Sequence, residues 1–151
     1  MFRRPILRNS ANFLNAGTTS QKYSLVFTTG TSSYLSRSSS SYNRSKFAIS
    51  FWLKRLQTGV GEVLCIKGTG TTATTEWYIL LTSGNKFDIG TTVGGINDGR
   101  LITTPTYTST SAFYHVLFHY DSANATAGDR MRLWVDGSEV TTFDTDTNPR
   151  S

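Results

Sequence analysis

The chain has 151 residues, the length of one ordinary domain, and its 37% hydrophobic and 13% aromatic content argues for a folded protein. A single cysteine, Cys65, excludes an intramolecular disulfide and gives no support to a zinc ribbon. No apolar run approaches the length that spans a membrane, so we expect no membrane insertion.

The net charge of +5 is unevenly distributed along the chain. Residues 1–61 contain nine basic residues and no acidic residue, whereas residues 62–151 contain six basic and ten acidic residues, which gives +9 and −4. We therefore expect the N-terminal part to seek an anionic partner, either nucleic acid, a membrane surface, an acidic glycan or an acidic protein. An ordinary solvated surface is the alternative.

Residues 1–20 predict an arm that is separate from a domain formed by residues 21–151. The arm is rich in arginine, and a brief helix is expected over residues 11–16. Ordering costs about 1 to 2 kcal/mol per residue, so we expect so short a segment to become ordered only on an acidic partner surface. An organelle transit peptide is the alternative interpretation. The predicted anchoring residues are Phe2, Arg3, Arg4, Ile6, Arg8 and Phe13.

From Tyr23 onward, short runs rich in β-branched and aromatic residues predict antiparallel strands. Alternation is clearest in residues 46–55, where one face is predicted to be core and the other carries Ser50 and Trp52. The predicted core face consists of Phe47, Ile49, Phe51 and Leu53. The predicted strands lie within residues 22–30, 46–55, 61–68, 76–84, 85–90, 112–121 and 130–143.

Turn residues punctuate these strands. Asp136-Gly137 predicts a two-residue type I′ hairpin, because both residues tolerate a positive φ. Asn97-Asp98-Gly99 predicts another turn, and Gly94-Gly95 is also interpreted as a turn. Residues 121–129 predict a longer loop.

Two histidines, His115 and His119, have the four-residue spacing that zinc proteases use on a helix. Their sequence context predicts a strand, where positions four apart are separated by about 13 Å, too far to share one zinc ion. The general-base Glu and a third ligand are also missing. We therefore interpret them as structural or surface histidines and expect no metal site and no cofactor.

The order of four stretches resembles the concanavalin A-like lectin/glucanase superfamily, in the LamG-type form common in bacteriophage virion proteins. The stretches are residues 24–37, 47–55, 113–121 and 129–143. The resemblance implies an all-β, antiparallel jelly-roll β-sandwich over about residues 23–148.

Such domains usually continue past the final hairpin with closing strands, whereas residues 144–151 predict a polar loop. The sandwich is therefore expected to be incomplete at its C-terminal end. The sequence is a fragment, the domain is minimal, or a neighbouring subunit covers the open edge.

Hydrolytic enzymes of this fold need two carboxylates that flank the scissile bond. No predicted strand supplies such a pair, so we expect no catalytic residues and no enzymatic activity. The isolated acids are Glu62, Glu76, Asp88 and Glu139, and Asp144 and Asp146 are expected to solubilise a loop.

Sugar recognition needs an aromatic plate beside polar side chains, although each aromatic residue is alternatively part of the core. The candidates for glycan binding are Trp77, Tyr78, Asn97, Asp98, Arg100, Tyr107 and Trp134. The weak candidates for calcium ligands are Asp121, Asn124 and Asp129, whose spacing matches no known calcium loop.

These observations together predict a non-enzymatic virion component of a bacteriophage, either a head decoration or fibre protein or a tail-fibre module. It assembles in the host cytoplasm, and its lectin-like surface attaches to glycans or the host surface. The arm is expected to bind other virion proteins. A homo-oligomer, with a trimer favoured, is expected because an unpaired edge invites association; no specific nucleic acid is expected. The alternatives are a free carbohydrate-binding module or non-catalytic appendage of a glycan-active enzyme, and an intracellular protein with a cleaved transit arm.

Overall fold

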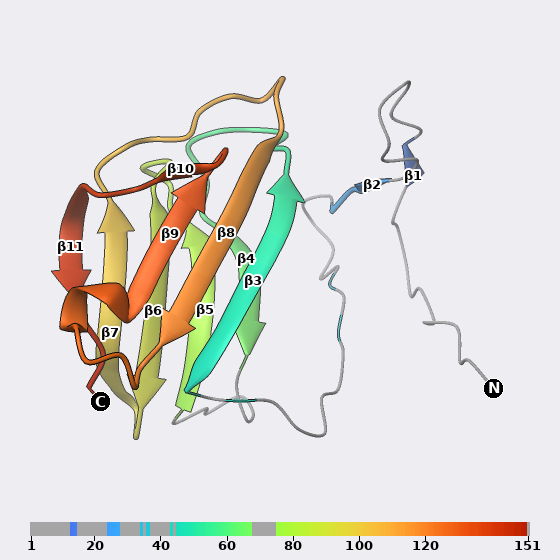
Figure 1. The fold of residues 1–151 in the computed structure, drawn as a ribbon. Coiled ribbons are helices and arrows are strands. Elements are labelled where there is room, and N and C mark those ends of the chain that lie inside the picture. Colours follow the sequence, from blue (N-terminus) through green and yellow to red (C-terminus); the bar gives the residue numbers. More distant parts are fainter. Residues whose placement is uncertain are drawn as a thin grey trace. The chain divides into compact units, whose positions relative to one another are not determined.

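The computed structural model describes residues 13–14, 24–27, 34, 36, 43, 45–67 and 75–150 (Figure 1). Contacts divide the chain into two units, residues 1–42 and 43–151. In the first unit, β1 (Phe13–Leu14) pairs antiparallel with β2 (Ser24–Leu25). The brief helix predicted over residues 11–16 is therefore wrong at its centre, because these residues pair with a second strand. The other predicted anchoring residues lie outside the described residues, and the boundary after residue 20 stays a prediction.

The second unit contains two antiparallel sheets that face each other (Figure 1). The four-stranded sheet has the order β10-β9-β8-β3 and the five-stranded sheet the order β11-β7-β6-β5-β4. In the first, the strands are β3 (Lys46–Leu53), β8 (Tyr114–Asp121), β9 (Met131–Val135) and β10 (Ser138–Glu139). In the second, they are β4 (Glu62–Lys67), β5 (Thr75–Leu81), β6 (Phe87–Val93), β7 (Ile96–Thr103) and β11 (Phe143–Thr147).

This architecture confirms the predicted all-β, antiparallel sandwich. The helical content of the second unit, where it is described, is the 3-10 turn η1 (Ala127–Asp129). Within the described ranges, no helix is long and apolar enough to cross a membrane.

The alternation predicted for β3 is confirmed. Burial alternates residue by residue along the strand, and β3 pairs with β8 over eight positions, from Lys46↔Asp121 to Leu53↔Tyr114. The predicted core face packs against the buried cluster, whereas Trp52 is 55% exposed on the other face. Since β-strand side chains alternate between faces, this register also fixes which residues of β8 point outward.

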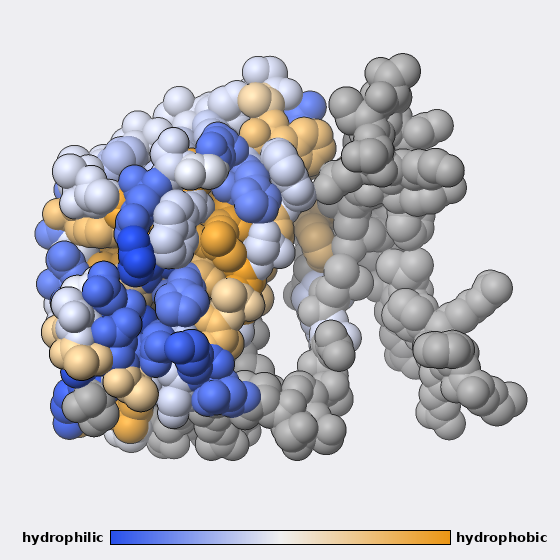
Figure 2. Space-filling view, in the orientation of Figure 1, coloured by the Kyte–Doolittle hydropathy of each residue, from blue (hydrophilic) through white to orange (hydrophobic). Residues whose placement is uncertain are grey.

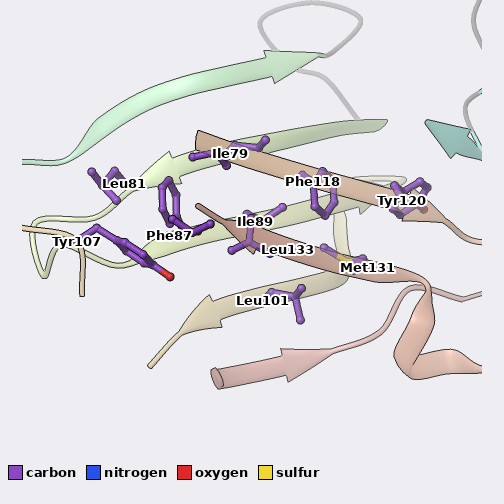
Figure 3. Packing of buried hydrophobic residues seen from close by; sticks show 12 residues of the cluster. Ile79, Leu81, Phe87, Ile89, Leu101, Tyr107, Phe118, Tyr120, Met131 and Leu133 are labelled. Atoms are coloured by element: carbon purple, nitrogen blue, oxygen red, sulfur yellow. The ribbon is translucent and has the colours of Figure 1, made fainter. Parts of the chain in front are cut away.

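The core lies between the two sheets (Figure 3). Phe47 of β3 joins them, because its ring centroid lies 5.1 Å from that of Trp77 on β5 and 5.1 Å from that of Tyr120 on β8. Burial of this apolar surface is the main favourable contribution to folding. The five-stranded sheet contributes Ile79, Leu81, Phe87, Ile89 and Leu101, and the four-stranded sheet Val116, Phe118, Tyr120, Met131, Leu133 and Val135.

The predicted hairpin between β9 and β10 is confirmed, with φ of 52° at Asp136 and 79° at Gly137. The turn predicted at Asn97-Asp98-Gly99 is wrong, because these residues belong to β7. The β6–β7 turn lies instead at Gly94-Gly95, as the sequence also indicated, with φ of 62° and 79°. A register shift opposite Thr91 and Thr92 accommodates the polar residues within the strand.

The predicted polar loop over residues 144–151 is also wrong for its first part. Residues 143–147 form β11, which pairs with β7 at the edge of the five-stranded sheet. An edge strand tolerates polar and charged residues, and Asp144 forms an ion pair with Lys86. Pro149 is then buried, and its carbonyl accepts a hydrogen bond from Arg130 at 2.8 Å.

Candidate functional site

Three residues on neighbouring strands form one row across the outer face of the five-stranded sheet. Tyr78 of β5 pairs with Gly90 of β6, which pairs with Arg100 of β7. The residues that follow them in sequence, Ile79, Thr91 and Leu101, are buried. Because side chains alternate along a strand, the row faces away from the core. We call Tyr78, Asp88, Gly90 and Arg100 the tyrosine site.

The ring of Tyr78 occupies the space that a side chain at position 90 would fill. A Cβ atom at Gly90 would lie 2.3 Å from Oη and 2.4 Å from Cζ of Tyr78, far closer than atoms approach each other. Glycine therefore allows the ring to lie against the backbone of β6. Burial, which is the largest cause, and the charge of Asp88 raise the pKa of Tyr78, so its hydroxyl remains a protonated donor at neutral pH.

A bidentate ion pair lies beside the ring. Arg100 donates from Nε to Oδ1 of Asp88 at 3.0 Å and from Nη2 to Oδ2 at 2.6 Å. The side chain of Asp88 is 6% exposed, whereas that of Arg100 is 38% exposed. The hydrogen bond to Asp88 raises the pKa of Arg100, so the guanidinium stays charged. Two of the five N–H donors of the guanidinium are used by Asp88 and another by Tyr78, which leaves donors that can contact a ligand.

This arrangement suits a sugar. A ring held against the sheet gives an apolar surface on which the C–H face of a sugar can stack, and neighbouring N–H and O–H groups can bond to its hydroxyls. The guanidinium contributes to the Tyr78 environment directly, since its hydrogen bond lowers the pKa of the hydroxyl in opposition to burial. Of the residues predicted for glycan binding, the structure brings together Tyr78 and Arg100. Asn97 is exposed one row further along the sheet, opposite Thr92.

The structure separates the other candidates from this site. Trp77 packs on the core side, against Phe47. Tyr107 is buried with its ring centroid 4.6 Å from that of Phe87, and burial raises its pKa to about 12. Neither ring is available as a surface plate. Asp98 is 9% exposed and binds Arg150 at 2.8 Å.

Sequence reasoning missed Asp88 and Gly90. Asp88 was interpreted as an isolated acid. The alternation along residues 87–90 nevertheless indicated that Asp88 and Gly90 face outward, since Phe87 and Ile89 face the core. The partner of Asp88, Arg100, lies twelve positions further along the chain and on the next strand. Only the register of β6 with β7 reveals that pair.

The weak calcium candidates are engaged in other contacts. Asp121 accepts a hydrogen bond from Lys46 Nζ at 2.7 Å, and that bond lowers the pKa of Asp121. Asn124 Oδ1 accepts a hydrogen bond from the backbone N–H of Thr126 at 2.9 Å, and Asp129 lies in η1. Among the residues whose positions the structure gives, no group of three His, Cys, Asp or Glu side chains could hold a metal ion.

A shallow pocket of about 310 Å³ lies between the β9–β10 hairpin and the connections that follow β7 and β10. Its two acids already accept hydrogen bonds. Asp136 Oδ1 receives the backbone N–H of His115 at 2.7 Å, and Glu139 receives two bonds from Arg132 at 2.6 and 2.7 Å. We therefore place the candidate site at the tyrosine site and not in this pocket.

The two facing antiparallel sheets, with polar and aromatic residues fixed on an outer face, define a lectin-type β-sandwich. The model of the Laminin_G_3 family, described as the concanavalin A-like lectin/glucanases superfamily, matches residues 29–151. The match covers most of the chain, which therefore belongs to this superfamily, and the resemblance at that level is confirmed. No curated protein and no solved structure matches the chain.

Proposed function

We propose that the domain is a non-enzymatic glycan-binding module whose binding surface centres on Tyr78, Asp88 and Arg100. The observation that carries this proposal is the aromatic ring held against Gly90 beside a bidentate ion pair on the outer face of the five-stranded sheet. Membership of a lectin and glucanase superfamily supports carbohydrate as the ligand class. Because the Tyr78 ring and the Arg100 guanidinium are already held by their neighbours, little side-chain entropy would be lost on binding.

The positions of the acids support a binding role without hydrolysis. Glu76 and Asp88 flank Tyr78 on the same face, but four residues along β5 and one strand spacing separate their Cα atoms by about 14 Å. The two carboxyl groups of glycosidases lie about 5 to 9.5 Å apart, so the side chains of Glu76 and Asp88 would both have to reach along the sheet toward each other. Asp88 is also held toward β7 by Arg100, on the side away from β5.

Calorimetric titration with soluble oligosaccharides of glucose, N-acetylglucosamine, galactose and rhamnose tests this function. We expect Tyr78→Ala and Arg100→Gln each to weaken binding at the tyrosine site by tenfold or more. The matched control is Tyr34→Ala, which removes a tyrosine that is 77% exposed in the other unit. Unchanged affinity in both site variants, or the appearance of new reducing ends during incubation, would contradict the proposal.

We further propose that the module is a virion component, a head decoration or fibre protein or a tail-fibre module, held on the particle by residues 1–20. The resemblance of residues 24–37 and 129–143 to phage virion domains and the absence of acids from residues 1–61 support this role. Deletion of residues 1–20 should leave the sandwich folded but remove it from particles. Changing Arg3, Arg4 and Arg8 together to Ala should make attachment weaker and more sensitive to salt. Normal incorporation of the truncated chain would show that residues 1–20 are not the anchor and would favour the transit-peptide interpretation of this segment.

The predicted homo-oligomer, with a trimer favoured, belongs to the same proposal. β4 and β11 are the outermost strands of the described five-stranded sheet, and an unpaired edge invites association. Light scattering on the full chain measures the state directly. A monomer with a cooperative melt would contradict the prediction.

A further inference from the structure

The outer face of the four-stranded sheet carries a second set of aromatic and polar side chains, which Figure 2 views from the front. The register aligns Trp52 with His115, and in the next row Ser50 with Leu117 and Trp134. The core residues of β8 and β9 alternate with these positions, so the side chains point to the outside. We call this surface the tryptophan face, and it consists of Ser50, Trp52, His115, Leu117, Arg132, Trp134 and Glu139.

Trp52 is exposed and yet held by its neighbours. Its side chain is 55% exposed, and its ring centroid lies 4.9 Å from that of His115. The imidazole is fixed in turn, because Nε2 of His115 and Oγ of Ser50 share a hydrogen bond of 2.8 Å. A large apolar ring fixed in this way presents contact area at low entropic cost on binding.

Trp134 is fixed by a separate chain of contacts. The guanidinium carbon of Arg132 lies 4.9 Å from the centroid of the Trp134 ring, a cation–π contact. Arg132 is held by two hydrogen bonds to Glu139 at 2.6 and 2.7 Å. The two tryptophans are therefore held independently. Trp52 is held by His115 on the adjacent strand, and Trp134 is held by Arg132 on its own strand.

The spacing of the two rings suits an extended ligand. Trp52 and Trp134 are separated by two strand spacings and by two residues along the strand, which places their Cα atoms about 12 Å apart. Leu117 lies between them in the register. A single small ligand cannot stack on both rings, whereas a chain of several units that crosses the strands diagonally can.

The charges on this face indicate an uncharged ligand. Arg132 is paired with Glu139, and Lys46 at the far end of β3 is paired with Asp121 at 2.7 Å. A third cation, Lys54 just beyond β3, has its Nζ 5.8 Å from the centroid of the Phe113 ring, in a cation–π contact. Polar groups that both donate and accept, Ser50 and His115, interrupt the apolar surface beside the exposed ring. Protein interfaces concentrate dry apolar contact at their centre, so this alternation of rings and amphiprotic groups favours a hydroxylated ligand over a protein partner.

We propose that the tryptophan face is a second binding surface, for an extended, uncharged glycan chain. Sugar rings stack on Trp52 and Trp134, and their hydroxyl groups bond to Ser50, His115 and Arg132. This surface goes beyond the tyrosine site, since it lies on the opposite sheet with the core between them. The two surfaces can therefore bind separate chains at the same time.

Nuclear magnetic resonance of the full chain tests this surface. The sequence contains three tryptophans, so the indole N–H signals report Trp52, Trp134 and, as an internal control on the core side, Trp77. The probes are cellohexaose, laminarihexaose and chitohexaose, with hexagalacturonate as the charged comparison. We expect at least one neutral probe to shift the Trp52 and Trp134 signals in a saturable manner and to leave Trp77 in place. Hexagalacturonate should bind at least fivefold more weakly.

Variants separate this surface from the tyrosine site. Trp52→Ala and Trp134→Ala should each weaken the titration of the remaining tryptophan signal by about tenfold, whereas Tyr78→Ala should leave it unchanged. The idea is overturned if no neutral probe moves either signal, if hexagalacturonate binds more tightly, or if both signals change with protein concentration in the absence of sugar. Loss of binding in Tyr78→Ala alone would instead assign all binding to the tyrosine site.

Discussion

The ring of Tyr78 packs against Gly90 on the adjacent strand and fills the space that a side chain at position 90 would occupy. We predict that Gly90→Ala displaces the ring, because its Cβ would meet the far end of a side chain that can swing away. Glycan affinity at the tyrosine site should fall by tenfold or more, and the free energy of unfolding by about 1 kcal/mol.

A double-mutant cycle checks this relationship. In a Tyr78→Ala background, Gly90→Ala has no ring to displace, so its effect on unfolding should disappear. Chemical denaturation of the four proteins gives the coupling free energy. Additive effects of the two substitutions would show that the ring does not depend on the glycine.

The buried carboxylate of Asp88 predicts a second stability effect. Arg100→Ala removes the partner of Asp88, whose side chain is 6% exposed in the intact ion pair, and this should lower the free energy of unfolding by about 1 to 3 kcal/mol after allowance for the partly exposed guanidinium. Asp88→Asn in addition should restore part of the loss, since an amide needs no counter-charge. The matched control is Arg132→Ala, whose ion pair is exposed on both sides and should matter much less. Equal losses in Arg100→Ala and Arg132→Ala, measured in urea, would contradict this account.

The strands that could be predicted are those with strong alternation. Phe47 and Ile49 alternate with Ala48 and Ser50, so the sequence of β3 alone predicted both that it is a strand and which of its faces is buried. The Asp136-Gly137 turn was likewise local, because two residues with positive φ specify it. The same alternation predicted Trp52 on the outer face, and its exposure in the structure confirms this.

The features that could not be predicted depend on residues far apart in the chain. β11 is polar and becomes a strand through pairing with β7, some forty positions away. The bulge that keeps Asn97 and Asp98 within β7 depends on the register with β6. The ion pair between Asp88 and Arg100 depends on the same register, and local propensity contains no information on which strands are neighbours.

The β9–β10 hairpin gives a prediction about backbone conformation. Gly137 has a φ of 79°, which side chains with a Cβ rarely adopt, so Gly137→Ala should lower the free energy of unfolding by about 1 kcal/mol. Gly128→Ala is the control, because a Cβ there meets nothing within 4 Å and its φ is not in that region. Thermal melts that fall equally for both variants would argue against strain at the hairpin.

Tyr107 predicts a loss of stability in alkali. Burial raises its pKa from 10.0 to about 12, which means that the folded state disfavours the phenolate. The stability that protonated Tyr107 contributes to the folded state is complete below pH 10 and is lost as the pH rises from about 10 to about 12. Tyr107→Phe should flatten this decline, and denaturant titrations at a series of pH values measure it. An absorbance titration in which every tyrosine ionises near its ordinary pKa would refute the prediction.

The pairing of β3 with β8 has a consequence for how the chain folds. Lys46 meets Asp121 across 75 positions, whereas β4 to β7 form a meander in which each strand pairs with the next. Local pairs form early and distant pairs must wait for loop closure, so the meander is expected to assemble while its partner sheet is still absent. During synthesis, the inner surface of that meander stays open to water from the emergence of Leu101 until Phe118 and Leu133 arrive to cover it. That interval is when the nascent chain is most exposed to aggregation.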